Sequence, residues 1–343
     1  MKVRFKKLLS RKEFIAVIIF FLGIVAYFYF TFFTSNYYEG KSPKQFEIAK
    51  GETFNDLVDR LYGEGIIPSK VDMRIAGFIY GAGKKIRAAR YHVPNGLSYL
   101  DLLNLFIYGD AEFMRTVSIR DGLSIGWMAY VLKRDALIDS TDFVNLAFNK
   151  HFVDSLGINK SSLEGYLLTG TYEIYENSPA REVISKMYIN FQKFMNDTLK
   201  ARAASLDFNT HQILTLASII KGETSLPEDM PAISGVYHNR LRIGMKLQAD
   251  PTVQYLLKGG WRRLLHKDLM LNSRYNTYKY TGLPPGPINN PGKDAILATL
   301  YPENHNYLFF VADGKGGHKF SSAYKEHLKK VNEYRRWLKS QSK

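Results

Sequence analysis

The 343-residue sequence predicts an α+β protein with one membrane-spanning helix near its N-terminus. Three observations lead to this prediction. Phe14 to Phe33 is an uncharged run of roughly twenty residues. Three later segments each combine a β-prone residue, a Gly turn and a helix start, and the chain after residue 205 alternates short apolar runs with Gly, Pro, Asn and Tyr. A hydrophobic content of 45% is enough for real cores, so we expect folded units and not a disordered chain.

The apolar run sets the expected compartment. A helix of this length covers the roughly 30 Å of a bilayer's hydrocarbon core. Six basic residues precede it, which favours a cytoplasmic N-terminus and places the bulk of the chain outside the cytoplasm. A cleaved signal peptide is the alternative, but the run is long for a signal core and "TSNYYEG" offers no cleavage site. We therefore expect a cytoplasmic tail over 1–13 and a retained transmembrane helix over 14–34.

Charge and composition narrow the class of partner and of site. The formal net charge of +15 favours an anionic partner, which could be nucleic acid, anionic lipid or an acidic cell-wall polymer. A location outside the cytoplasm argues against nucleic acid. The absence of cysteine excludes disulfides, thiolate zinc sites and cysteine nucleophiles. No HExxH motif occurs, so we predict no metal site and no cofactor.

Three segments after the apolar run share one pattern, and they are Ile48–Ile67, Val93–Phe106 and Ile119–Ile138. Each has a β-prone residue, a Gly three positions later, then Thr or Ser two positions after the Gly, followed by apolar residues at helical spacing. This pattern predicts a strand, a Gly turn and a capped helix, with Thr53, Ser98 and Ser124 as the N-caps. Asp56 and Asp101 lie at the third helical position, where a carboxylate favours the helix N-terminus.

The first of these segments resembles the LysM module, a small carbohydrate-binding fold, in its opening "KGETFNDL". The resemblance covers about twenty residues and implies a glycan-binding role. The alternative is that a strand, a turn and a capped helix form a common unit without any ligand.

An acid stands at the end of the apolar helix predicted from "THQILTLASIIKGE". Glu223 lies three residues after Ile220 and seven after Leu216, so helical spacing puts its carboxyl group on the apolar stripe. Desolvation there should raise the pKa of Glu223. The alternative is an ordinary surface acid at a helix end.

Four segments around and after Glu223 closely resemble the endolytic murein transglycosylases of the YceG-like family, namely "LASIIKGET", "NRLRIGMKLQADPTVQY", "YNTYKYTGLPPGPINNPG" and "LFFVADGKGGHKFS". "EGYLLTGTYEI" matches a further family segment, and the likeness runs from about Lys50 to the C-terminus. It implies a LysM-like small α/β subdomain over 35–110, a helical linking subdomain over 111–204, and a mixed α/β, lysozyme-like catalytic domain over 205–343.

The resemblance also implies the activity. Members are lytic transglycosylases of the bacterial cytoplasmic (inner) membrane, which cleave the MurNAc-β-1,4-GlcNAc bond of nascent glycan strands without water. The products carry 1,6-anhydroMurNAc ends, elongation stops, and peptidoglycan synthases are the expected partners. The family's catalytic glutamate precedes a Thr and maps onto Glu223. The sequence departs from the family at Lys221, where a Glu is usual, and at Gly222, where a Lys is usual, which could loosen the helix end.

One carboxyl group suffices for this reaction if the attacking group is the sugar's own C6 hydroxyl. A hydrolytic muramidase, with Asp250 as the second carboxylate, and a non-catalytic peptidoglycan-binding scaffold remain alternatives. Substrate could be bound by Gln248, Asp250, Asn276, Thr277 and Tyr278, and Tyr275 and Tyr280 could stack on sugars, although each also has a plausible structural duty. We expect Glu164 to be a surface charge. We expect His318 to lie in a β-hairpin over 307–321, and 324–340 to form a basic amphipathic helix.

Overall fold

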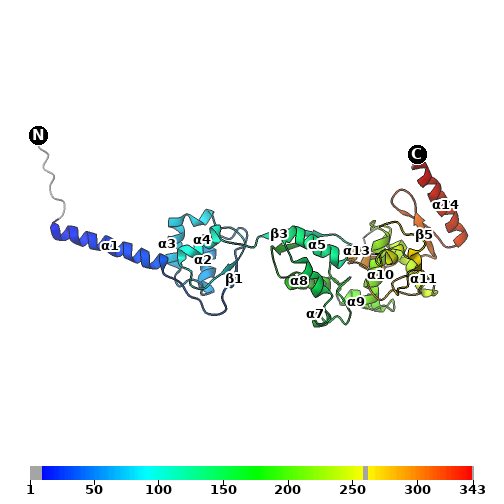
Figure 1. Ribbon diagram of the computed structural model, residues 1–343, viewed down its shortest axis with the longest axis horizontal. Coiled ribbons are helices and arrows are strands. Elements are labelled where there is room, and N and C mark those ends of the chain that lie inside the picture. Colours follow the sequence, from blue (N-terminus) through cyan, green and yellow to red (C-terminus); the bar gives the residue numbers. More distant parts are fainter. Residues whose placement is uncertain (1–9, 258–261, 342–343) are drawn as a thin grey trace. The chain divides into compact units, whose positions relative to one another are not determined.

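The computed structural model describes residues 10–257 and 262–341, so most of the expected tail over 1–13 lies outside the described residues. The chain divides into two compact units, Met1–Met114 (unit 1) and Arg115–Lys343 (unit 2), as Figure 1 shows. Helices predominate, and the strands of the described ranges form three two-stranded sheets. The mixed α and β content is therefore confirmed.

The first helix, α1 (Arg11–Phe33), begins with a capping box in which Ser10 and Glu13 bond each other's backbone N–H groups. Within residues 10–257 and 262–341 it alone is long and apolar enough to cross a membrane. The predicted helix over 14–34 is confirmed as an element. Its C-terminal end is part of unit 1, because Phe32 is buried in the core of that unit and Phe28 packs against the same core.

Unit 1 is a small α/β fold in which helices pack against a two-stranded sheet. After α1 its elements are β1 (Lys44–Glu47), α2 (Phe54–Gly63), α3 (Lys70–Tyr80), η1 (Ala82–Lys84), β2 (Arg90–Val93) and α4 (Tyr99–Tyr108). β1 and β2 pair antiparallel, with Lys44 opposite Val93. The core lies between sheet and helices, and Phe46, Tyr91 and Phe106 are among its largest fully buried side chains.

The three strand, turn and helix segments form as predicted. Gly51, Gly96 and Gly122 follow the strands with φ of +86°, +85° and +86°, a conformation that glycine adopts without strain. Thr53 and Ser98 accept from the backbone N–H of Asp56 and Asp101, so both predicted caps are confirmed. Ser124 occupies the cap position but its side chain makes no capping hydrogen bond.

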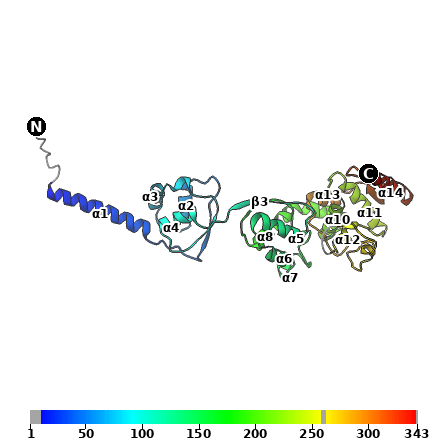
Figure 2. The same ribbon diagram turned by 45° about the horizontal axis from the view of Figure 1, so that its top comes forward.

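Unit 2 contains the remaining elements, with β3 beginning at the unit boundary. These elements are β3 (Met114–Ile119), α5 (Ile125–Ala136), α6 (Ser140–Ala147), α7 (Lys150–Ser155), β4 (Gly170–Tyr175), α8 (Ala180–Phe194), α9 (Asp197–Ala204), α10 (Thr210–Glu223), α11 (Met230–Arg242), α12 (Asp250–Gln254), η2 (Asp268–Met270), α13 (Gly292–Leu300), β5 (Phe309–Ala312), β6 (His318–Ser321) and α14 (Tyr324–Gln341). One continuous core joins residues from Val117 to Leu300, so the segments 111–204 and 205–343 share it. α10 lies among α11, α12 and α13 at its centre (Figures 1 and 2).

The C-terminal part matches its prediction. β5 and β6 form an antiparallel hairpin, with Phe309 opposite Ser321 and Ala312 opposite His318. His318 is a hairpin residue as expected, and its Nδ1 lies 2.8 Å from a carboxylate oxygen of Asp229. α14 is the predicted basic helix and packs on this hairpin.

Candidate active site

Helix α10 carries the candidate catalytic acid at its last residue. Asn209 and Gln212 form a capping box at the other end, and every residue from Ile213 to Ile220 is buried. The helix stops because Thr224 turns to an extended conformation, with φ of −143°. Glu223 therefore sits where a buried helix reaches the surface of the unit, and its side chain is partly buried.

Tyr237 of α11 holds the Glu223 carboxyl group. Its hydroxyl donates to Oε1 of Glu223 at 2.5 Å, and Tyr237 is itself almost fully buried with its ring edge against Phe310. Burial raises the pKa of Glu223 to about 7, and the hydrogen bond from Tyr237 acts in the opposite direction. At neutral pH the group is thus divided between its acid and carboxylate forms.

Two charged groups act on the same carboxyl. The negative charge of Asp250 raises the pKa of Glu223 further, and the positive charge of Arg240 lowers it. Arg240 is one helical turn after Tyr237 on α11, and its buried guanidinium donates to the carbonyl oxygens of Leu308 at 2.7 Å and Leu247 at 2.5 Å. These bonds fix the cation beside the acid.

Gly222 allows the start of α12 to approach the end of α10. A Cβ atom at residue 222 would lie 2.6 Å from Cβ of Pro251, closer than real contacts allow, and 3.9 Å from Cδ1 of Ile288. The residue after Gly222 is Glu223 and the residue before Pro251 is Asp250, so this close contact brings the two acids toward each other. The helix remains regular through Glu223, so Gly222 does not loosen its end.

The proline-rich loop after residue 282 is fastened to α10 and to two other segments. The backbone N–H of Ile288 donates to Oγ of Ser218 at 3.0 Å, and Asn289 donates to the Ser218 carbonyl at 2.9 Å. Asn290 is fully buried; it accepts from the N–H of Gly165 and donates to the carbonyl of Leu123. The loop is therefore a rigid support beside the end of α10.

The expectation that Glu164 is a surface charge is wrong. Glu164 is only 4% exposed. Its carboxyl oxygen Oε1 accepts from the backbone N–H of Ile125 at 3.1 Å and from the side-chain amide of Asn290 at 2.9 Å. Burial raises its pKa to about 8. Glu164 thus caps α5 in place of Ser124, a role that needs a residue forty positions away and that no local pattern indicates.

The predicted substrate-binding residues separate into two groups. Gln248 and Asp250 are exposed, and the hydroxyl of Tyr278 donates to Asp250. Asn276 and Thr277 have exposed fractions of 0% and 2%, and their polar atoms bond the protein itself. Asn276 donates to two backbone carbonyls, and Thr277 accepts from the N–H of Ala249. These two side chains hold the segment that carries Asp250 and Tyr278 and have no surface to offer a ligand.

Several supporting residues escaped the sequence analysis. Tyr237 and Arg240 have the three-residue spacing that puts two side chains on one helix face, which is the only local signal for them. Asn290 has none, since its partners lie more than a hundred residues away. Across 10–257 and 262–341, no group of three His, Asp or Glu side chains could hold a metal ion.

Comparison with known proteins identifies relatives along most of the chain. The sequence is 29% identical over 311 residues to an endolytic murein transglycosylase of Bacillus subtilis (strain 168), covering 86% of each chain. It is 28% identical over 283 residues to an endolytic murein transglycosylase of Streptococcus pneumoniae (serotype 2 strain D39), covering 73% of this chain and 51% of that protein.

The fold has a relative of known structure. A crystal structure of a putative yceG-like protein from Listeria monocytogenes superposes with a TM-score of 0.59 at 27% identity, covering 83% of this chain and 98% of that one. The model of the YceG-like family matches residues 46–333. With its acid-bearing helix, the support around that helix and this match, the chain belongs to the YceG-like family.

Proposed function

We propose that this protein is a membrane-anchored endolytic murein transglycosylase with Glu223 as its catalytic acid and base. The observation that carries the proposal is the Glu223 carboxyl group at the end of a buried helix, with a pKa of about 7 and a hydrogen bond from Tyr237. The naming of its relatives as endolytic murein transglycosylases supports the same activity. The catalytic function is assigned to residues 205–343.

The reaction needs one group that gives a proton and then takes one back. The protonated Glu223 donates its proton to the glycosidic oxygen between MurNAc and GlcNAc, and the bond from that oxygen to the MurNAc anomeric carbon breaks. The C6 hydroxyl oxygen of the same MurNAc bonds to the anomeric carbon, and its proton passes to the Glu223 carboxylate. The product end is 1,6-anhydroMurNAc, no water is consumed, and Glu223 is protonated again.

The surroundings of Glu223 suit both halves of this cycle. Burial supplies the protonated form, and the nearby Arg240 charge with the Tyr237 hydroxyl stabilises the carboxylate formed after the first transfer. Because the C6 hydroxyl is part of the substrate, correct positioning contributes several kcal/mol, up to about 7 to 11 in favourable cases. Gln248, Asp250 and Tyr278 are proposed to contact the sugar, and Asn276 and Thr277 to hold their segment in place.

A hydrolytic muramidase is the second candidate, because Asp250 is exposed and its charge acts on Glu223. In that reaction Asp250 would activate a water molecule or attack the sugar. The two reactions differ by one water in the product, so the mass of the new glycan ends distinguishes them.

The test compares Glu223→Gln with the matched control Glu228→Gln, an exposed loop acid five residues further along. Purified murein is digested, and the soluble products are weighed by mass spectrometry. Anhydro ends from the native protein and the control, with cleavage reduced at least about a hundred-fold in Glu223→Gln, are expected. Reducing ends, or unchanged cleavage in Glu223→Gln, contradict the proposal.

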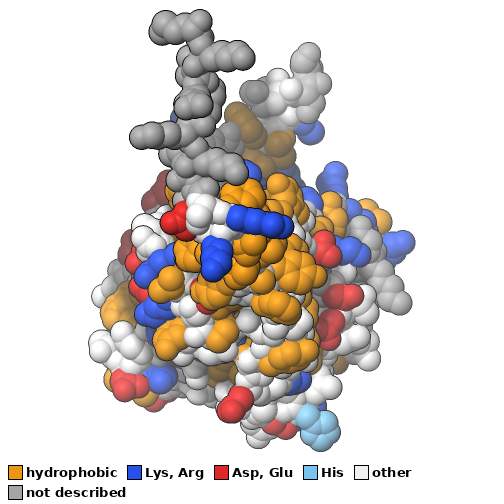
Figure 3. All heavy atoms as spheres, turned by 90° about the vertical axis from the view of Figure 1, so that its left-hand side faces the viewer, with side chains coloured by type: hydrophobic (Ala, Val, Ile, Leu, Met, Phe, Trp, Pro, Cys, Tyr) orange, Lys and Arg blue, Asp and Glu red, His pale blue; other side chains and the backbone are white. Residues whose placement is uncertain are grey.

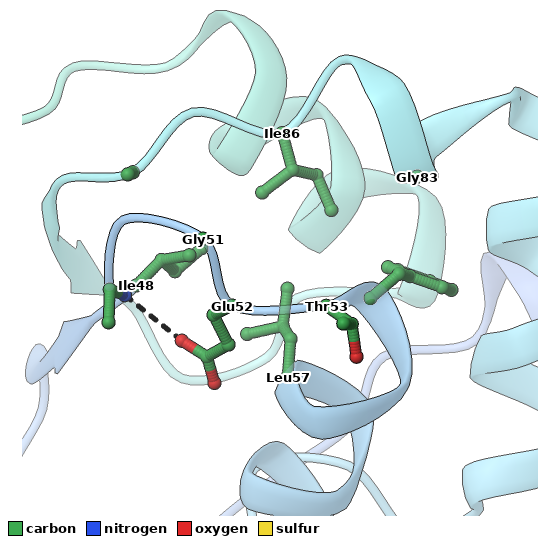
Figure 4. A pocket seen from close by; sticks show the side chains of 10 residues that line it. Ile48, Gly51, Glu52, Thr53, Leu57, Gly83 and Ile86 are labelled. Atoms are coloured by element: carbon green, nitrogen blue, oxygen red, sulfur yellow. Dashed lines mark hydrogen bonds between the residues drawn. The ribbon is translucent and has the colours of Figure 1, made fainter.

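Unit 1 is proposed to hold the protein at the membrane and to contact glycan. α1 would be the single-pass anchor, with units 1 and 2 outside the cytoplasm and the strand-synthesising enzymes as partners. Figure 4 shows a pocket of unit 1 lined by Gly51, Thr53 and Ile86, in which Glu52 accepts from the N–H of Ala49 at 3.0 Å. Its volume of about 90 Å³ is below the roughly 300 Å³ of a small enclosed site, so a sugar would rest across it.

This binding role has its own test in the non-cleaving Glu223→Gln protein. Ala88 is exposed at the pocket, and Ala88→Glu adds a charge there without disturbing the core. Retention on insoluble murein should fall relative to Ala201→Glu, an exposed position on α9. Equal retention removes the glycan-binding role from unit 1.

A further inference from the structure

Helix α3 carries an apolar stripe on its outward side. Val71, Phe78 and Ile79 share one helical face and are 62%, 87% and 63% exposed, and Ile75 between them is partly buried against the core. The opposite side holds Met73 and Ala76 in the core. We call this stripe the α3 face. A surface helix of a water-soluble domain has polar residues on its outer side, so the α3 face is expected to contact something other than water.

The same helix is attached to α1. The hydroxyl of Tyr27 donates to Oδ1 of Asp72, in the first turn of α3, at 2.9 Å. Phe28 and Phe32, one and five residues further along α1, pack against the core of unit 1. In Figures 1 and 2, α3 lies at the side of unit 1 where the C-terminal end of α1 joins it. Unit 1 therefore already flanks α1 from Tyr27 onward.

The length of α1 decides the depth of this contact. Phe14 to Ala26, the part before Tyr27, spans only about 20 Å at 1.5 Å per residue. Crossing the hydrocarbon core takes roughly 30 Å, which is the span of Phe14 to Phe33. If α1 crosses fully, Tyr27 lies about 9 Å inside the outer end of the span, and Asp72 lies beside it. An amphipathic helix at a membrane surface is buried to about 5–10 Å, the same depth.

The charges around the α3 face suit a lipid surface. Lys84 and Lys85 follow α3 and are exposed, whereas Lys70 and Arg74 on α3 itself pair with Asp59 at 2.9 and 3.0 Å. Figure 3 looks along α1 toward the rest of unit 1, and hydrophobic side chains gather over the centre of this view with Lys and Arg side chains among them. Apolar side chains flanked by basic ones are the composition that binds the boundary between lipid headgroups and acyl chains.

We propose that the α3 face lies in the outer leaflet of the membrane, at the boundary between headgroups and acyl chains. The occupant of this face is the lipid bilayer, and the inference rests on the proposed anchoring by α1. Unit 1 is then held against the membrane at two places, the α1 helix and the α3 face, and cannot swing about the end of α1.

The absence of native cysteine makes the test direct, because one introduced thiol is the only labelling site. The full chain carrying Phe78→Cys is labelled with an environment-sensitive fluorophore and reconstituted in vesicles of phosphatidylethanolamine and phosphatidylglycerol. The control is Gln45→Cys, an exposed position on β1, which Figure 1 places at the other side of unit 1. Quenchers attached to shallow acyl positions should reduce fluorescence at 78 by roughly two-fold or more relative to 45.

The other outcomes each overturn the inference in a recognisable way. Equal quenching at 78 and 45, in protein that resists carbonate extraction, overturns the α3 contact and leaves the anchor intact. Extraction by carbonate shows that α1 does not anchor the chain and overturns both. Shielding of position 78 in detergent that grows with protein concentration assigns the face to a second copy of the chain. Cleavage of murein in the same samples is measured separately and bears only on Glu223.

Discussion

At the scale of the residue, burial raises the pKa of Glu223, and two neighbours adjust it in opposite directions. The hydrogen bond from Tyr237 lowers the pKa of Glu223, and the charge of Asp250 raises it. A general acid works in its protonated form, so activity should fall as pH rises through about 7. Removing either neighbour should shift the pH at which activity declines, in a direction that follows from its effect on the pKa of Glu223.

Tyr237→Phe and Asp250→Asn are expected to shift the high-pH decline of activity in opposite directions. Loss of the Tyr237 hydroxyl removes a bond that favours the carboxylate, so the pKa of Glu223 rises and kcat/KM persists to higher pH. Loss of the Asp250 charge removes repulsion, so the pKa falls and kcat/KM declines at lower pH. The measurement is the pH profile of glycan cleavage by each variant.

Glu228→Gln again serves as the control and should leave the profile unchanged. Shifts of both variants in the same direction would contradict the arrangement of charges described here. If Asp250→Asn instead removes nearly all cleavage at every pH, Asp250 takes part in the chemistry and the hydrolytic reading gains support.

At the scale of the element, the end of α10 and the start of α12 are matched in shape. Gly222→Ala would place a methyl group 2.6 Å from Pro251, and relief of that overlap should push the two helices apart. Overpacking of this kind costs about 1–3 kcal/mol. We expect a lower melting temperature and a pH profile displaced toward that of Asp250→Asn, because the Asp250 charge moves away from Glu223.

The matched control is Gly126→Ala on α5, where an added Cβ meets no atom within 4 Å. That variant should melt at or above the native temperature, since Ala favours a helix. Equal melting of Gly222→Ala and the native protein would show that α12 yields easily and does not fix Asp250.

Helix α5 depends on a buried acid for its cap, which links stability to pH. The pKa of Glu164 is about 8 in the fold against 4.5 as its ordinary value, so the folded state holds a proton that the unfolded chain loses. Unfolding free energy should therefore fall as pH rises from about 4.5 to 8, by up to about 5 kcal/mol in total. Glu164→Gln cannot lose a proton and should melt with a flatter dependence on pH, as calorimetry at pH 5 and 8 would show. A dependence as steep as that of the native protein would assign the effect to other groups.

Elements built from neighbouring residues could be predicted from the sequence. The caps at Thr53 and Ser98 and the left-handed glycines follow from patterns of five to eight residues, and so does the hairpin around His318. The cap of α5 could not be predicted, since Glu164 reaches it through tertiary folding. Ser124 stands at the N-cap position, yet the backbone N–H of Ile125 donates to the distant carboxyl group of Glu164.

At the scale of the whole molecule, the sequence suggested three segments after the membrane helix, and the structure has two compact units. The segments 111–204 and 205–343 share a core because α9 packs against α10 and α13 and because Asn290 bonds Gly165 and Leu123, far away in the chain. Such contacts leave no periodic pattern. Glu223 could be proposed as the catalytic acid because a family motif surrounds it, whereas the Tyr237 bond depends on how α10 and α11 pack.

Shortening the chain at its N-terminus should separate anchoring from folding. A chain beginning at Ile24 keeps Phe28 and Phe32, which pack against unit 1, and a chain beginning at Asn36 lacks both. Both should leave the membrane fraction. Only the shorter chain should also lose stability in unit 1, by about 3 kcal/mol or more, since it loses a buried aromatic side chain. Hydrogen exchange of the Phe46 and Tyr91 amides measures this, and equal protection in the two chains would show that α1 adds nothing to the fold.

The position of Glu223 on the final turn of α10 has a consequence for heat inactivation. Most of that helix is buried at the centre of unit 2, and no flexible segment separates its interior from its last residue. Warming cannot loosen the acid while sparing the rest, because local opening there would expose the middle of the unit. Loss of activity and unfolding of unit 2 should thus occur at the same temperature, so an activity assay after heating would also report the melting temperature of the unit.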